Sequence, residues 1–84
     1  MKITFKLFAT LTDYLPAQAR YSNAIELEVA PNASISQILE PFALPHKLVH
    51  LVLVNGTYVQ PGERLTRTLK EGDTLAIWPP IAGG

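Results

Sequence analysis

The sequence predicts an α+β fold of two layers, in which one main helix covers one face of a mixed sheet of four to five strands. Three observations predict it. Segments that alternate apolar and polar residues, as half-buried strands do, occur near both ends of the chain. An amphipathic helix pattern lies between them. A chain of 84 residues is long enough for one hydrophobic core and too short for two.

The first two expected strands span residues 2–8 and 24–30. In KITFKLF every second residue is apolar, and in AIELEV the apolar residues alternate with Glu26 and Glu28. We expect the apolar residues to face inward, the charged ones to face water, and the two strands to form a hairpin-like pair. Pro16 rules out a long regular helix in the connection 9–23, which we expect to be a loop with a single helical turn.

The expected helix begins at Ser34. Ser34 and Gln37 have the spacing of a capping box, in which each side chain bonds the backbone N–H of the other residue. The apolar residues that share one helical stripe are Ile35, Ile38, Leu39 and Phe42. Because Pro41 has no N–H, the helix should end or kink near Glu40, and Pro45 should start a further turn.

The second half of the chain contains three more expected strands. Residues 48–54 are almost continuously apolar, which is typical of an interior strand. Asn55-Gly56 then predicts a tight hairpin turn into a short strand at 57–59. Residues 62–70 form a polar excursion held by Leu65 and Leu69, and a last strand spans 74–78. The order strand, strand, helix, strand, short strand, strand indicates a β-grasp.

Composition excludes several classes of function. Seven Lys and Arg residues balance seven Asp and Glu residues, so no net positive field attracts a nucleic acid, and we expect no such partner. The absence of cysteine excludes a disulfide scaffold, a thiolate metal site and a cysteine nucleophile. No signal-peptide pattern and no run of 18 apolar residues occurs, so we expect a cytoplasmic protein without a membrane partner.

No motif for self-contained catalysis is present. The sequence has no Gly-rich phosphate loop and no Ser-His-Asp arrangement. His46 and His50 are four residues apart, but no third metal ligand accompanies them. Glu26 and Glu28 are best interpreted as a solvated strand face. We therefore expect no metal, no bound cofactor and no enzymatic activity of the chain itself.

The C-terminal stretch WPPIAGG is the most informative motif. Pro79 and Pro80 lack N–H groups and have a fixed φ, so they should end the last strand and project the following residues as an extended arm. We therefore divide the chain into a domain at 1–78 and a flexible tail at 79–84. Alternation turns Trp78 away from the core, where it either docks a partner or packs locally on the two prolines.

The last two residues, Gly83 and Gly84, indicate which chemical group the arm presents to a partner. Gly83 and Gly84 have no Cβ, so their backbone can pass through a channel too narrow for a side chain. The carboxylate of Gly84 is ionised at neutral pH and can act as a nucleophile toward the α-phosphate of ATP.

With this element order, the Asn-Gly hairpin, LKEGDTLAI and PPIAGG, the sequence resembles the ubiquitin-like sulfur carriers of the MoaD/ThiS family over essentially its whole length, and it looks most like MoaD. The resemblance implies that an E1-like enzyme adenylates Gly84 with ATP. A persulfide-bearing partner then replaces AMP with sulfur, and Gly84 becomes a thiocarboxylate. ATP would be used by the activating partner rather than bound by this chain.

The resemblance also implies roles for the rest of the tail. In a MoaD-like protein the arm would insert into the large subunit of molybdopterin synthase during molybdenum cofactor biosynthesis, guided by Trp78, Pro79, Pro80, Ile81, Ala82 and Gly83. The chain would then be the non-catalytic small subunit. Three alternatives stay open: a ThiS-like carrier for the thiazole of thiamin or another sulfur pathway, a ubiquitin-like modifier, and a plain interaction module. One departure from the family is the connection 9–23, which usually contains a longer helix.

Overall fold

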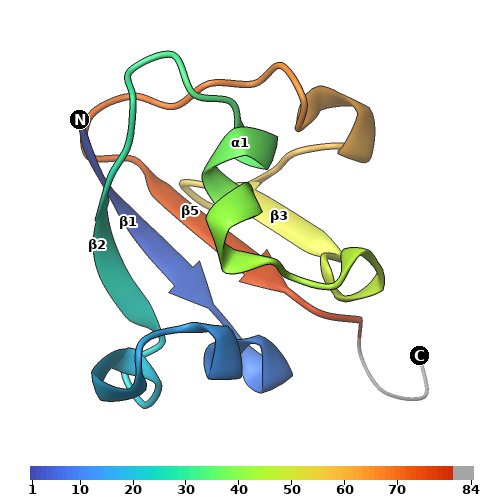
Figure 1. Cartoon of the computed structure of the whole chain (residues 1–84). Helices are drawn as coiled ribbons and strands as arrows, with labels where there is room; N and C mark the ends of the chain where they lie inside the picture. Colours follow the sequence, from blue (N-terminus) through green and yellow to red (C-terminus); the bar gives the residue numbers. More distant parts are fainter. Residues whose placement is uncertain (81–84) are drawn as a thin grey trace.

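The computed structural model describes residues 1–80 and contains five strands, one α-helix and five short 3-10 helices in that range (Figure 1). In chain order these elements are β1 (Lys2–Leu7), η1 (Ala9–Tyr14), η2 (Ala17–Ala19), β2 (Ala24–Glu28), α1 (Ile35–Leu39), η3 (Glu40–Phe42), η4 (His46–Leu48), β3 (Leu51–Val54), β4 (Thr57–Tyr58), η5 (Pro61–Glu63) and β5 (Thr74–Trp78).

The five strands form one mixed sheet in the order β2-β1-β5-β3-β4. The neighbours β1 and β5 run parallel, and the other three pairs are antiparallel. The helix α1 crosses one face of this sheet, so the molecule has two layers (Figure 1). The expected α+β fold is confirmed, with five strands and one main helix in the β-grasp arrangement.

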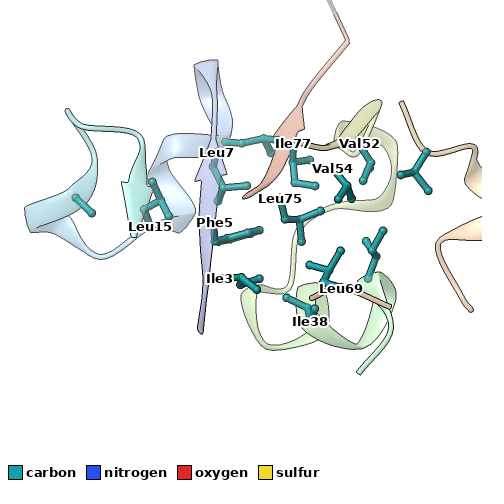
Figure 2. Packing of buried hydrophobic residues seen from close by; sticks show 14 residues of the cluster. Ile3, Phe5, Leu7, Leu15, Ile38, Val52, Val54, Leu69, Leu75 and Ile77 are labelled. Atoms are coloured by element: carbon teal, nitrogen blue, oxygen red, sulfur yellow. The ribbon is translucent and has the colours of Figure 1, made fainter. Parts of the chain in front are cut away.

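The core lies between α1 and the sheet, and alternate residues of the central strands fill it (Figure 2). The buried strand residues that belong to this core are Ile3, Phe5, Leu7, Val52, Val54, Leu75 and Ile77, and Ala76 of β5 is buried as well. From the helix side, Ile35 and Ile38 are buried, and the ring of Phe42 packs on Phe5 with centroids 4.6 Å apart. The inward faces predicted from alternation are therefore confirmed for β1 and β5.

The capping box at the start of α1 is also confirmed. The N–H of Gln37 donates to the Ser34 hydroxyl at 3.2 Å, and the N–H of Ser34 donates to Gln37 Oε1 at 2.8 Å. The α-helix lasts five residues and then tightens into η3, which contains Pro41. Ala43 closes η3 in a left-handed conformation with φ of 53°. Pro45 precedes η4, as expected.

Two expectations about the connections are wrong. The segment 9–23 is not a loop with a single turn, because η1 and η2 occupy much of it on either side of Pro16. Three apolar residues at four-residue spacing, Leu11, Leu15 and Ala19, are buried there, and this burial stabilises the two short helices. Leu65 does not hold the excursion 62–70 in place, since it is 73% exposed, whereas Leu69 is buried.

The Asn55-Gly56 turn contacts the EGD segment, residues 71–73, of the LKEGDTLAI motif. Asn55 and Gly56 have positive φ of 51° and 82°, as a hairpin turn of this type requires. Asn55 Nδ2 donates to Asp73 Oδ1 at 2.9 Å, and Asn55 Oδ1 accepts from the Thr74 N–H at 2.9 Å. The Lys70 N–H donates to Asp73 Oδ2, and this bond, followed by the bond from Asn55, holds the pKa of Asp73 below its ordinary value. The hairpin is thereby fixed to the start of β5.

Candidate functional site

The last strand, β5, lies in the middle of the sheet and determines where the C-terminal segment starts. It is bonded on one side by β1 and on the other by β3. At its end the His50 N–H donates to the Trp78 carbonyl at 3.0 Å, and the Phe8 N–H donates to the Ile77 carbonyl at 3.2 Å. Because neighbours hold the strand on both sides, residue 78 is a fixed point from which the following residues extend.

The half-buried Trp78 lies on the face of the sheet opposite α1, as alternation predicts. Its ring stacks on Phe8, with centroids 3.9 Å apart and the planes 1° from parallel. Neither alternative proposed for Trp78 included this contact. The signal was present in the sequence, because alternation in β1 carries Phe8 to the polar face of that strand, but only the parallel pairing of β1 with β5 brings the two rings together.

An apolar area surrounds this stack on the same face. In the sheet register, Leu51 pairs with Trp78, and Leu53 pairs with Tyr58. Leu51 and Tyr58 are 37% and 46% exposed, which is high for large apolar side chains on a strand. We call Phe8, Leu51, Leu53, Tyr58 and Trp78 the outer-face patch. It explains why β3 is apolar on both faces: Val52 and Val54 fill the core, and the other two residues form the patch.

The residues after Trp78 are described only in part. Pro79 is buried and Pro80 is exposed. Both prolines were expected to guide the arm, but only the exposed Pro80 is accessible to a partner in this conformation. The other expected tail residues, Ile81, Ala82, Gly83 and Gly84, lie outside the described residues.

The polar groups near the patch serve the fold. Arg64 donates from Nε to the Val59 carbonyl and from Nη2 to the His50 carbonyl, both at 3.2 Å, and its guanidinium lies 6.0 Å from the centre of the Tyr58 ring. Within residues 1–80, no group of three His, Asp or Glu side chains could hold a metal ion. What this face offers chemically is a contact surface for an apolar partner surface, beside the start of the C-terminal segment.

Helices in the described part of the chain are short, and none of them has the length and apolar character needed to cross a membrane.

Comparisons with known proteins agree with this geometry. The family model described as Mut7-C ubiquitin matches residues 1–82. No curated protein is found to match by sequence.

Solved structures of similar fold cover nearly the whole chain. Small archaeal modifier protein 1 from Haloferax volcanii is 23% identical, with a TM-score of 0.65 over 95% of this chain and 98% of its own. Urm1 from Trypanosoma brucei is 21% identical, with a TM-score of 0.66 over 99% and 95%.

Subunit 1 of molybdopterin-converting factor from Helicobacter pylori, solved in complex with subunit 2, is 17% identical, with a TM-score of 0.61 over all of both chains. At these identities the structures establish the shared fold. The family match over residues 1–82, together with the β-grasp architecture, shows that the chain belongs to the ubiquitin-like Mut7-C ubiquitin family.

Proposed function

We propose that this protein is a sulfur carrier whose Gly84 carboxylate is adenylated by an E1-like enzyme and converted to a thiocarboxylate. The observation that carries the proposal is a diglycine sequence that follows a central strand of a ubiquitin-like fold, with only residues 79–82 between them. A strand held on both sides gives the following residues a fixed origin, so an arm that begins there can be aimed into the active site of a partner.

The outer-face patch supports the same proposal. It lies beside the end of β5, so a partner that binds the patch would receive the C-terminal segment at the edge of its contact surface. Tyr58 and Trp78 are residue types enriched at the centre of protein interfaces. The activating enzyme is the partner we assign to this surface.

The proposed chemistry uses the carboxylate of Gly84 as the only reacting group of this chain. Its oxygen attacks the α-phosphate of ATP and displaces pyrophosphate. The persulfide of a sulfur donor attacks the acyl carbon, and AMP leaves. A thiol of the partner then cleaves the remaining S–S bond and leaves sulfur on Gly84. The chain supplies the carrier carboxylate and the docking surface, and the partner enzymes supply catalysis.

For the acceptor we propose molybdopterin synthase, with this chain as its small subunit. The support is the sequence resemblance to MoaD and the shared fold with subunit 1 of molybdopterin-converting factor from H. pylori. A ThiS-like role in thiamin thiazole formation is the rival within the same chemistry. Incubation of the thiocarboxylated protein with a molybdopterin synthase large subunit and a cyclic pterin precursor distinguishes the two. Dithiolene formation supports the first role, and an unchanged pterin contradicts it.

A second candidate is a ubiquitin-like modifier that becomes attached to lysine. The observation in its favour is the shared fold with small archaeal modifier protein 1. Conjugates linked through Gly84 to lysine in extracts of the cells that make the protein would favour this function over sulfur transfer.

The carrier proposal is tested by incubating the protein with ATP, an E1-like enzyme and a persulfide donor. A thiol-directed alkylating reagent then reports the product. Because the chain contains no cysteine, no thiol of its own competes for the reagent. We expect a mass gain equal to the exchange of one oxygen for sulfur, and alkylation at Gly84. A variant with one residue appended after Gly84 should remain unlabelled, and labelling of that variant would contradict the proposal.

The role of the outer-face patch is tested separately by Leu51→Arg. An unpaired charge buried in an apolar interface lowers the affinity of the activating enzyme for this protein, by a factor that ranges from several-fold to more than about a hundredfold. Thiocarboxylation at low carrier concentration should slow by the same factor. Leu65→Arg is the matched control, because it makes the same change at a side chain that is 73% exposed outside the patch. Equal rates for the two variants would exclude the patch as the docking surface.

A further inference from the structure

Within residues 1–80 the sheet has one long free edge, at β2 (Figure 1). β2 has five residues, whereas β4 at the opposite edge has two. Proteins protect exposed edges with proline, bulges, very short strands or charged side chains that point inward. β2 has no proline, and its inward residues Ile25 and Leu27 are apolar. Its backbone is therefore open to a further strand.

The register shows which backbone groups are open. The N–H of Val29 donates to the carbonyl of Met1, and the N–H of Leu7 donates to the carbonyl of Asn23. Bonded and non-bonded pairs alternate along an antiparallel ladder. Every second residue from 23 to 29 is thus bonded to β1, beginning with Asn23.

The residues between them direct their N–H and C=O groups away from the sheet. These are Ala24, Glu26 and Glu28. The Ala24 carbonyl accepts a long 3.4 Å bond from the Ser22 hydroxyl. The backbone of Glu26 and Glu28 consequently offers two N–H donors and two C=O acceptors, at the spacing that a neighbouring strand would use.

A groove lies beside the C-terminal end of β2, on the side of α1. It has a volume of about 270 Å³ between β2 and the helix layer, and apolar residues including Leu27, Val29, Ile38 and Phe42 line it. A strand added beside β2 would direct alternate side chains into this groove, because successive side chains of a strand point to opposite faces. The groove therefore selects apolar residues at every second position.

The opposite face of β2 selects for charge. The side chains of Glu26 and Glu28 are exposed there, and they would lie directly beside an added strand. Lys2 and Lys6 belong to β1, one strand further away, at about 9–10 Å from the added strand. Glu28 pairs with the N-terminal ammonium group at 2.9 Å, whereas Glu26 makes no ion pair within residues 1–80.

This acidic face also disfavours pairing between two copies of the protein. An antiparallel β2–β2 contact would place glutamates of one copy against glutamates of the other, and like charges directly opposite are destabilising. Lys or Arg at the intervening positions of the added strand would instead complement Glu26 and Glu28.

We propose that the β2 edge binds an extended segment of a partner protein in which apolar residues alternate with Lys or Arg, by adding it to the sheet as a sixth strand. The backbone groups of Glu26 and Glu28 form the ladder, the groove beside α1 receives the apolar side chains, and the two carboxylates pair with the basic ones. This interaction is independent of the chemistry proposed for Gly84.

Hydrogen exchange in the unaltered protein tests the proposal most directly. The probe is a short blocked peptide that alternates valine and lysine, and the control alternates valine and glutamate. We expect the lysine peptide to slow exchange of the Glu26 and Glu28 amides, while Ile25 and Leu27 are already protected in the free protein by β1. Unchanged exchange at Glu26 and Glu28, or protection without peptide that grows with protein concentration, would overturn the proposal.

Affinity measurements by fluorescence anisotropy supply the second test. The lysine peptide should bind about tenfold more tightly than the glutamate peptide, because two cross-strand charge pairs change from attractive to repulsive. Glu26→Pro removes an outward N–H without breaking a bond to β1 and should weaken binding about tenfold or more. Glu26→Gln removes the charge alone and should have a smaller effect, and Glu63→Gln on η5 should have none. Equal affinity for both peptides would refute the assignment.

Discussion

The stack of Phe8 on Trp78 gives the most detailed prediction about stability. If the ring planes are about 3.5 Å apart, the contact distance of carbon atoms, the centroid separation of 3.9 Å leaves a lateral offset of about 1.7 Å. At that plane separation the rings are offset rather than eclipsed, which is the favourable arrangement for parallel aromatic rings. Such pairs contribute about 0.5–1.5 kcal/mol beyond the area they bury.

A double-mutant cycle isolates this contribution. Phe8→Leu, Trp78→Leu and the double variant keep apolar side chains at both positions and remove the aromatic pair. Urea denaturation should give a coupling free energy of about 0.5–1.5 kcal/mol between the two positions.

The matched control is a second double-mutant cycle, in which Tyr58, another aromatic residue of the outer-face patch, takes the place of Trp78 as the partner of Phe8. Tyr58 lies three strands from Phe8, at about 14 Å, so Phe8→Leu and Tyr58→Leu should be additive within about 0.5 kcal/mol. A Phe8–Trp78 coupling no larger than this control would refute the inference that the two stacked rings stabilise the fold as a pair.

Three further predictions concern the turns and the helix. Gly56→Ala should cost about 1 kcal/mol, because φ is +82° and no atom lies within 4 Å of an added Cβ, whereas Gly62→Ala should be nearly neutral in the same denaturation assay. Ser34→Ala should cost about 1 kcal/mol by removing the capping box, measured as a lower urea midpoint. Folding holds the pKa of Asp73 below its ordinary value of 3.8, so the ionised carboxylate stabilises the fold fully above pH 3.8, and this contribution is lost as the pH falls through the lowered pKa. In an acid titration, Asp73→Asn should therefore lose less stability over this pH range than the unaltered protein does.

Local patterns were sufficient to predict most of the fold. Alternation identified the core face of β1, and the capping box placed the first residue of α1 at Ile35. Both signals depend on neighbours within a few residues, so the sequence contains them completely. The continuous apolar run before Asn55 likewise predicted an interior strand, although β3 begins at Leu51 because residues 46–48 form η4.

The features that were missed depend on contacts between distant residues. The outer-face patch combines residues of β3, β4 and β5 with Phe8, and alternation within one strand does not show which strands are neighbours. The same limit applies to the bond between Asn55 and Asp73, because these residues are 18 positions apart in the sequence. In 9–23, Pro16 excludes one long helix, but the four-residue spacing of Leu11, Leu15 and Ala19 favours two short helices that each bury one side of the segment.

The measurement that tests the central claim most directly is the intact mass of the protein purified from the cells that make it, with an alkylating reagent present during lysis. We expect a chain that ends at Gly84 and carries sulfur in place of one carboxylate oxygen, trapped as the alkylated thiocarboxylate. Because the sequence has no cysteine, fragmentation should locate the label at Gly84 alone. A chain that continues beyond Gly84, or one that stays unlabelled while the activating enzyme and the sulfur donor are present, would contradict it.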